Sequence, residues 1–348
     1  MAQTFETKKI NLALQGGGAH GAFTWGVLDR LLEEERLEFE GITATSAGAM
    51  NAAALKCGLI GRGREGARGR LEWFWDGVAQ YSLTSNPMVE WLRAWTPEVA
   101  SAAFTTPAYL ASEFVSRVAS PYDFNPMNVN PLRPLIGDLD FGNLHSPQGP
   151  KLFICATNVR TGKVRVFKDH EITTDTILAS ACLPTLFQAV EIDDPATGKT
   201  ESYWDGGYIG NPALFPLFYD TESPDIAIVH INPLYREDVP TRPDEILNRV
   251  NEISFNSSLL RELRAIEFVQ RLLANGSLDP EKFKDIHIHS LIDDETMTGL
   301  SVATKLIPDR KLLLSLKEAG RKVAETFLQS HWGDLNNRST VDLRAMFN

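Results

Sequence analysis

One serine in this sequence lies in a setting that favours nucleophilic chemistry. Ser46 is the centre of the segment Ala-Thr-Ser-Ala-Gly at residues 44–48, with small residues two positions before and after it. A nucleophile elbow, the tight strand-to-helix turn that exposes a serine hydroxyl, needs small residues there because bulk would block the turn. The first of them is Ala44, where glycine is usual. The alternative interpretation is that Ser46 only caps the N-terminus of a helix.

A glycine-rich loop precedes this serine. Residues 16–21, Gly-Gly-Gly-Ala-His-Gly, follow a short apolar run and open a helical pattern. Glycines allow several backbone N–H groups to point into one concavity, and a helix N-terminus favours an anion there. That anion is either the oxyanion of a tetrahedral intermediate or a pyrophosphate, since the loop also matches the dinucleotide-binding pattern G-x-G-x-x-G.

A candidate base follows later in the chain. Asp205 ends a predicted strand and precedes two glycines. Asp-Gly-Gly is most often a simple turn. A carboxylate at a strand end can also act as a general base, provided that burial raises its pKa from about 3.9 toward neutrality.

The elements that must position these residues alternate between strand and helix. Residues 10–15 and 42–45 have the pattern of buried strands, and helical patterns follow them at 22–35 and 47–57. Two successive strand–turn–helix units predict an α/β fold with a mostly parallel sheet.

The rest of the chain continues this alternation. Residues 61–70, basic and rich in glycine, are interpreted as a solvated connector. Proline and aromatic residues fill 87–134, which suits either an inserted helical cap or ordinary packing under the sheet. The apolar residues of a long helix at 246–275 are expected to pack in the core. Other patterns predict a hairpin at 151–158 and 163–168, strands at 226–232 and 285–291, and helices at 70–81 and 309–330.

Taken together, the motifs resemble the patatin-like phospholipase family. The resemblance rests on GGGAHG at 16–21, ATSAGAMNA at 44–52 and DGG at 205–207, and ASACLP at 179–184 resembles the family's helix before the aspartate strand. It covers about residues 10–218. It implies a three-layer α/β/α fold with a mostly parallel central sheet, an inserted helical cap and C-terminal helices. We expect a catalytic domain at 8–220, with the cap at 87–134, and a C-terminal α/β completion with long helices at 221–348.

The resemblance also implies a Ser–Asp dyad without a catalytic histidine. Ser46 would attack an ester carbonyl, Asp205 would accept its proton, and an acyl-enzyme would form. The oxyanion would be held by three backbone N–H groups, those of Gly17, Gly18 and Ala19. His20 and Ala47 are expected to contact the substrate. His20 stands where the family often has arginine or lysine, so a neutral ring there would favour less polar esters.

The remaining histidines are predicted to be structural. An ordinary α/β-hydrolase would use serine, aspartate and histidine in that order. A nucleophile on the second strand is too early for that fold, so His230, His287 and His289 are not expected to complete a triad. No pair of histidines is accompanied in the sequence by further residues that could bind a metal. Neither a metal nor a cofactor is predicted.

Composition narrows the class of protein further. A formal net charge of −11 over 348 residues argues against a nucleic-acid-binding protein. Three widely spaced cysteines suit a reducing compartment, and no apolar run reaches 18 residues. We therefore expect a cytoplasmic protein, with peripheral membrane contact and a homodimer left open.

The preferred function is a serine acyl hydrolase that cleaves lipid carboxylic esters, as a phospholipase A, lysophospholipase or lipase does. An intracellular polyhydroxyalkanoate depolymerase would use the same acyl-transfer machinery. A catalytically idle lipid-binding protein would have no need for both Ser46 and Asp205. A Rossmann-type protein needs an acid at the end of its second strand, whereas Glu38 and Glu40 precede that position.

Overall fold

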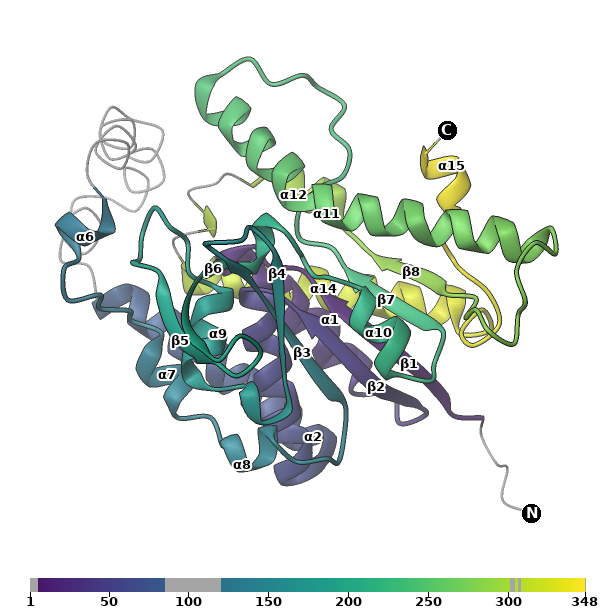
Figure 1. Ribbon diagram of the computed structural model, residues 1–348, viewed down its shortest axis with the longest axis horizontal. Coiled ribbons are helices and arrows are strands. Elements are labelled where there is room, and N and C mark those ends of the chain that lie inside the picture. Colours follow the sequence, from purple (N-terminus) through teal and green to yellow (C-terminus); the bar gives the residue numbers. More distant parts are fainter. Residues whose placement is uncertain (1–5, 85–119, 301–303, 306–307, 348) are drawn as a thin grey trace.

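An eight-stranded sheet runs through the part of the protein that the structure describes. The structure, a computed structural model, describes residues 6–84, 120–300, 304–305 and 308–347 (Figure 1). Within these residues the strand order is β5-β6-β3-β2-β1-β7-β8, and β4 pairs with β3. The strands are β1 (Lys8–Leu14), β2 (Leu37–Ala44), β3 (Lys151–Asn158), β4 (Val164–Lys168), β5 (Val190–Asp194), β6 (Lys199–Asp205), β7 (Asp225–Val229) and β8 (His287–Leu291).

The centre of this sheet is parallel and one side of it is antiparallel. β1 pairs in parallel with β2 and β7, β2 with β3, and β7 with β8. The pairings of β3 with β4 and β6, and of β5 with β6, are antiparallel. The prediction of a mixed α/β fold with a mostly parallel sheet is therefore confirmed, and strands from both sides of residue 220 belong to one sheet.

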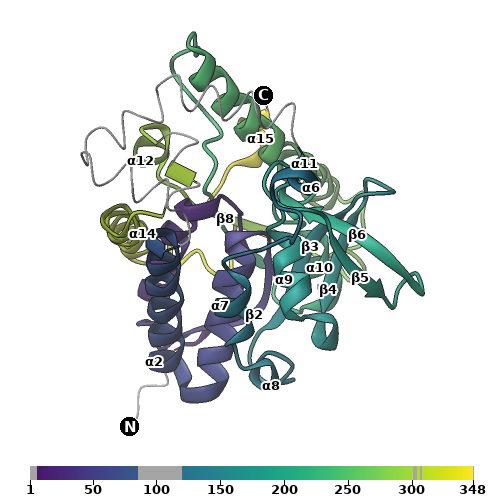
Figure 2. The same cartoon turned by 90° about the vertical axis from the view of Figure 1, so that its left-hand side faces the viewer.

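Helices cover both faces because successive strand residues point to opposite sides. In β1, Leu12 and Leu14 join one apolar core and Ala13 joins the other. The first core contains residues of α1 (Ala22–Leu31), α2 (Ala47–Thr84), α7 (Arg133–Gly137), α9 (Thr174–Ser180) and α14 (Arg310–His331). The second contains residues of α10 (Phe215–Asp220), α11 (Pro243–Ala274) and α15 (Leu343–Phe347). Figure 2 shows the sheet between these two helical layers.

The last long helix, α14, packs directly against the first helix, α1. A Cβ atom at Gly26 of α1 would lie 1.9 Å from the carbonyl oxygen of Lys317 in α14. A Cβ atom at Gly320 of α14 would lie 2.1 Å from the carbonyl oxygen of Phe23 in α1. The two backbones can touch only because each helix has a glycine at the crossing. The C-terminal part of the chain therefore supports the N-terminal unit that carries the glycine-rich loop.

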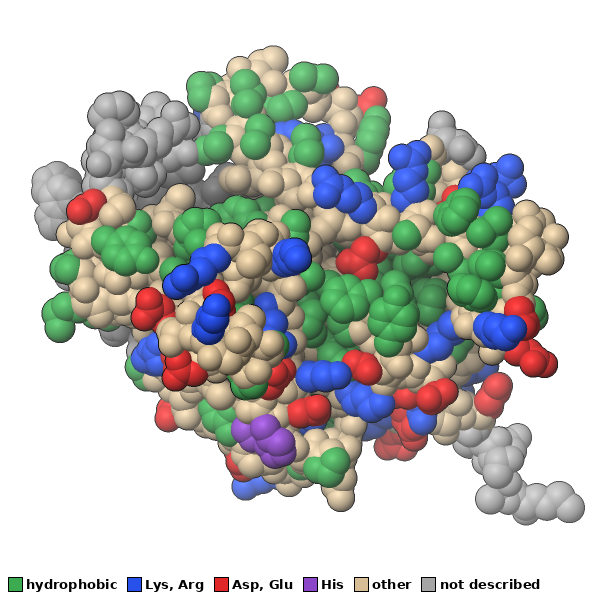
Figure 3. All heavy atoms as spheres, in the orientation of Figure 1, with side chains coloured by type: hydrophobic (Ala, Val, Ile, Leu, Met, Phe, Trp, Pro, Cys, Tyr) green, Lys and Arg blue, Asp and Glu red, His purple; other side chains and the backbone are tan. Residues whose placement is uncertain are grey.

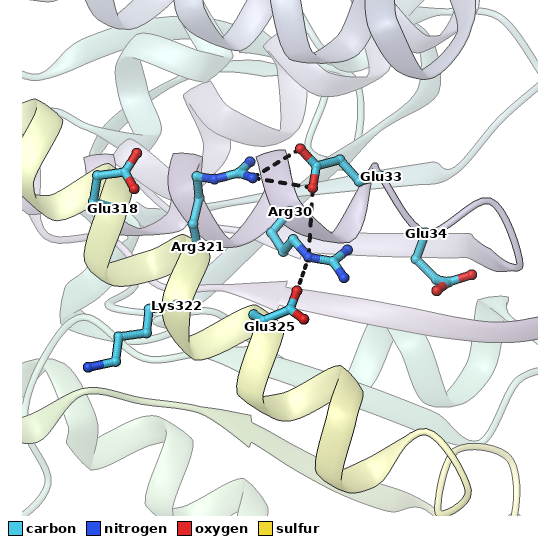
Figure 4. A pocket seen from close by; sticks show the side chains of 7 residues that line it. All are labelled: Arg30, Glu33, Glu34, Glu318, Arg321, Lys322 and Glu325. Atoms are coloured by element: carbon cyan, nitrogen blue, oxygen red, sulfur yellow. Dashed lines mark hydrogen bonds and ion pairs between the residues drawn. The ribbon is translucent and has the colours of Figure 1, made fainter.

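A charged hollow of about 500 Å³ lies beside this helix pair (Figure 4). Arg321 pairs with Glu33, and Arg30 pairs with both Glu33 and Glu325. None of its lining residues belongs to the segments around Ser46 or Asp205. Exposed ion pairs of this kind contribute little to stability, and we assign the hollow no chemistry. Its lining residues are Arg30, Glu33, Glu34, Glu318, Arg321, Lys322 and Glu325.

Two expectations about helices need correction. Residues 61–70 are largely exposed to solvent, as expected, but they are helical and not a connecting loop, because α2 continues through them with a break only at Arg62 and Gly63. Ala67 and Leu71 are fully buried, so core packing outweighs the low helix propensity of glycine in this segment.

The expected core packing of residues 246–275 is correct only for the second half of α11. Leu259 and Leu263 are buried, whereas Ile246, Val250 and Ile253 are 44%, 55% and 55% exposed. Figure 3 shows hydrophobic side chains gathered on the projecting part of the molecule that this first half forms. A 3.6-residue apolar repeat gives the face of a helix but not the length over which a neighbour covers it.

The predicted cap lies mostly outside the described residues. Of residues 87–134, only 120–134 are described, and they contain α6 (Pro121–Phe124) and the start of α7. None of the described helices combines the length and the apolar character needed to span a bilayer.

Candidate active site

Strand β3 brings the two candidate catalytic residues together. Ile154 of β3 pairs with Ala44 at the end of β2, and Ala156 pairs with Asp205 at the end of β6. β4 pairs with both Ile154 and Ala156 and so occupies the opposite edge of β3. β2 and β6 therefore approach each other along one edge from opposite directions. Their ends meet two residues apart along β3, a spacing of roughly 7 Å.

The serine lies on a strained turn. Ser46 has a φ of +55°, a left-handed conformation that costs a non-glycine residue free energy. A Cβ atom at Gly48 would lie 2.3 Å from the carbonyl oxygen of Leu14, so the turn packs directly on β1. The backbone N–H of Ser46 donates to Ser180 Oγ at 2.9 Å, and Ser180 Oγ donates to the Cys155 carbonyl at 2.7 Å. This strand-to-helix turn has the backbone geometry expected of a nucleophile elbow; that Ser46 is the nucleophile stays a prediction.

Asp205 lies in an environment that suits a base. Its side chain is buried, with 1% of its surface exposed, and Oδ1 accepts a 2.7 Å hydrogen bond from the backbone N–H of Gly207. Burial raises the pKa of Asp205 from 3.8 to about 7, while hydrogen bonding from Gly207 and from the Ser46 side chain acts in the opposite direction. No ion pair to Asp205 is formed by the described residues. Nothing there stabilises its charged form strongly, and the carboxylate keeps its affinity for a proton.

The glycine-rich loop is held by side chains from distant parts of the chain. The backbone N–H of Gly16 donates to Asn211 Oδ1 at 2.7 Å, and the Gly16 carbonyl accepts from Asn232 Nδ2 at 3.0 Å. The 3₁₀ turn η1 (Gly18–Gly21) follows, with Gly18 at a φ of +59°. Within the described residues no acceptor pairs with the backbone N–H groups of residues 17–19. These three groups are available to bind an anion.

The structure places the two predicted substrate contacts beside this loop. His20 is 2% exposed, and its Nε2 lies 2.8 Å from Thr304 Oγ1. Burial, and secondarily the charge of Lys305, lowers the pKa of His20 to about 3, so the ring is neutral at physiological pH. Ala47 is buried at the start of α2, against Gly21. That either residue contacts substrate stays a prediction.

Comparison with known proteins identifies the family of this chain. The model of the family described as patatin-like phospholipase matches residues 12–218, which include both candidate catalytic residues. The chain belongs to the patatin-like phospholipase family. Proteins of this family are generally ester hydrolases that act on lipids.

Individual similar proteins give less information about this chain than the family match does. The patatin-like chain is 39% identical to the uncharacterized protein YjjU of Escherichia coli strain K12 over 61 residues, which are 18% of this chain and 17% of that protein. The crystal structure of VipD from Legionella pneumophila aligns with 95% of this chain and 72% of that chain, with 14% identity and a TM-score of 0.38.

The other histidines of the patatin-like chain lie in structural settings. His289 Nε2 is 2.8 Å from Asp225 Oδ1, at the first residue of β7 and so at the amino end of the parallel strands. His230 is buried and lies 3.1 Å from Ser290 Oγ. In the described residues no histidine contacts Ser46 or Asp205, and no cluster of three potential ligands could hold a metal ion. The three cysteines are buried and unpaired.

Several residues that organise this site were missed by sequence reasoning. Ser180 holds the elbow, and Asn211 and Asn232 hold the glycine-rich loop. The segment 179–184 was noted for its likeness to the family, which offered a signal for Ser180. The two asparagines carry no such signal, because their role depends on which loops the fold brings together.

Proposed function

We propose that this patatin-like protein hydrolyses carboxylic ester bonds of lipids, with Ser46 as the nucleophile and Asp205 as the base. The observation that carries this proposal is the meeting of β2 and β6 along one edge of β3. It brings a serine on a strained elbow to a buried carboxylate whose pKa is raised to about 7. A base with a pKa near the working pH transfers protons most effectively.

The first half of the reaction forms an acyl-enzyme. Ser46 Oγ attacks the ester carbonyl carbon while its proton passes to the Asp205 carboxylate. The carbonyl oxygen becomes an oxyanion, which the backbone N–H groups of residues 17–19 stabilise. The tetrahedral intermediate then collapses. The bond to the alcohol breaks, and the alkoxide leaves with the proton that Asp205 held.

The second half regenerates the enzyme. Water attacks the acyl carbon, and Asp205 accepts one of its protons. The second tetrahedral intermediate collapses with cleavage of the bond to Ser46 Oγ, which takes the proton back from Asp205. The fatty acid leaves, and one carboxyl group serves as base and acid in both halves.

A neutral His20 bears on the substrate class. The glycine-rich loop has no cationic side chain at position 20, because burial keeps the imidazole uncharged. We therefore propose that the enzyme does not depend on a phosphate head group. Rates on a diacylglycerol and on a phosphatidylcholine with the same acyl chains are expected to differ by less than about tenfold, since no charge-assisted contact at this position separates them. A preference of more than a hundredfold for the phospholipid would contradict this.

A fluorophosphonate probe tests the nucleophile directly. Folded wild-type protein is expected to be labelled once, with the label in the peptide that contains Ser46, and Ser46→Ala is expected to remain unlabelled. An acyl-chain and head-group panel then compares wild type with Ser46→Ala and Asp205→Asn. Ester hydrolysis that survives Ser46→Ala would overturn the proposal.

A further inference from the structure

Lys305 lies next to the glycine-rich loop although it is 87 residues beyond the segment that the family model matches. Its side chain is partly buried, and Nζ donates to Asn232 Oδ1 at 2.9 Å. No salt bridge to this group is formed within the described part of the chain. Glu252 is the buried acid whose charge acts on the pKa of Lys305, and it already pairs with Arg236 and Arg249.

A partly buried lysine without an ion pair is costly. Removing an ammonium group from water disfavours its charged form, and one neutral hydrogen bond compensates only part of that free energy. Core packing alone would be served better by an apolar side chain of the same length. The position of Lys305 is therefore better explained by what its charge and hydrogen bond do for the neighbouring loop.

Three separate contacts connect residues 304–305 to that loop. Lys305 Nζ holds Asn232, whose amide nitrogen donates to the Gly16 carbonyl at 3.0 Å. The Lys305 carbonyl oxygen lies over Gly18, where a Cβ atom would be only 2.3 Å away. Thr304 Oγ1 lies 2.8 Å from His20 Nε2. The contacts reach the beginning, middle and end of residues 16–20, the stretch that contains the three available N–H groups.

We propose that Lys305 is a positioning residue that holds the glycine-rich loop through Asn232 with its N–H groups set for the oxyanion. This inference rests on the proposed function and adds to it a residue outside the segment matched to the family. Its charge also adds a positive field near the place where negative charge develops in the transition state, which is worth most where water is excluded.

The charge of Lys305 changes with pH within the range over which enzyme activity can be measured. Burial lowers the pKa of Lys305 to about 8; Glu252 acts against this shift and Arg236 adds to it. In the described ranges, the other titratable group that faces it is His20, which is neutral. Lys305 is therefore mostly charged at pH 7 and loses its charge above pH 8. A reaction that depends on that charge slows over the same interval.

The test compares Lys305→Met with Lys56→Met on a soluble short-chain ester at pH 7. Methionine keeps most of the length and removes the charge. Lys56 is a matched control because it is 6% exposed, lies on α2 and faces Asp169 rather than the loop. We expect Lys305→Met to lower kcat by about 10- to 100-fold with KM within about threefold, as a misplaced oxyanion site does. Lys56→Met should keep kcat within about threefold.

The pH profile separates a positioning role from a general loss of structure. Wild-type kcat is expected to fall above pH 8, and Lys305→Met should lack that fall. A kcat within threefold of wild type in Lys305→Met, or a fall above pH 8 that persists in it, overturns this inference. If Lys305→Met does not fold, the absence of a fall in the wild-type profile overturns it instead. Activity that survives Ser46→Ala refutes the proposed function itself, so the two failures are distinguishable.

Discussion

Two buried aspartates at opposite ends of the sheet have opposite acid–base properties. Asp205 is 1% exposed and Asp225 is 0% exposed. Asp205 accepts one backbone hydrogen bond and has a pKa of about 7. Asp225 accepts hydrogen bonds from the backbone and side-chain N–H groups of Asn336 at 2.8 and 3.1 Å, and lies 2.8 Å from His289 Nε2 and 3.5 Å from His287 Nδ1. These partners hold the pKa of Asp225 well below its usual range.

The difference shows that burial alone does not decide what a carboxylate does. Desolvation raises the pKa of both groups, and donors and positive charges then determine the result. Asp225 is surrounded by donors, so it stays charged and anchors the C-terminal segment to β7. Asp205 has few donors, which suits the role of base that we propose for it. Four measurements test or sharpen this contrast.

The largest effect is expected for Ser46→Ala. Removing the nucleophile should lower kcat/KM by at least about 10⁴-fold, because the acyl-enzyme can no longer form. Steady-state hydrolysis of a short-chain ester measures this, and circular dichroism checks that the fold is retained. A loss of less than tenfold would show that another residue is the nucleophile.

Asp205→Asn is expected to lower kcat by about 10³-fold or more while stabilising the fold above pH 7. Asparagine keeps an acceptor for the Gly207 N–H but has no charge to bury. The folded protein binds the Asp205 proton more tightly than the unfolded chain does, so this carboxyl lowers stability as the pH rises from about 4 to 7.

At pH 8 the variant's free energy of unfolding should therefore exceed that of wild type by up to about 4 kcal/mol. The gain should disappear below about pH 3, where Asp205 is protonated in both states. Urea titrations at the two pH values measure both quantities. A variant less stable than wild type at pH 8 would contradict the environment described for Asp205.

The pH profile should show an ascending limb set by the same group. Only the carboxylate accepts the serine proton, and the pKa of Asp205 is about 7. The kcat/KM of the free enzyme should be roughly tenfold below its plateau at pH 6. An activity that stays constant between pH 5 and 8 would exclude Asp205 as the base.

The smallest effect on activity is expected for Asp225→Asn, the same substitution at the other end of the sheet. It should leave kcat within about threefold of wild type and lower the free energy of unfolding by about 3 kcal/mol at pH 7, because His289 and Asn336 lose their charged partner. The deficit should shrink as the pH falls below about 4, where the carboxylate of the unfolded chain is protonated. A stabilised Asp225→Asn would remove the contrast between the two sites.

The three chemical segments could be predicted from sequence because their requirements are local. Each of them reflects the geometry of a few consecutive residues: the small residues around Ser46, the glycines of the glycine-rich loop, and the carboxylate of Asp205 before two glycines. The same holds for the alternation of strands and helices, since side-chain periodicity is a property of one element. The mostly parallel sheet and the family of the protein could both be predicted from these local patterns.

The tertiary structure decided the properties that depend on pairs of distant residues. The register of β6 on β3 brings Asp205 to Ser46, and a shift of one residue would turn its side chain to the other face. The contacts of Asn232 and Lys305 with the glycine-rich loop depend on strands and helices that follow residue 218. The two glycines after Asp205 mark it as a candidate base in the sequence, but the sequence does not give the pKa of either aspartate. Asp225 has its lowered pKa because of His289 and Asn336, which lie 64 and 111 positions further along the chain, whereas Asp205 has no such partners among the described residues. Only the folded chain brings such partners together.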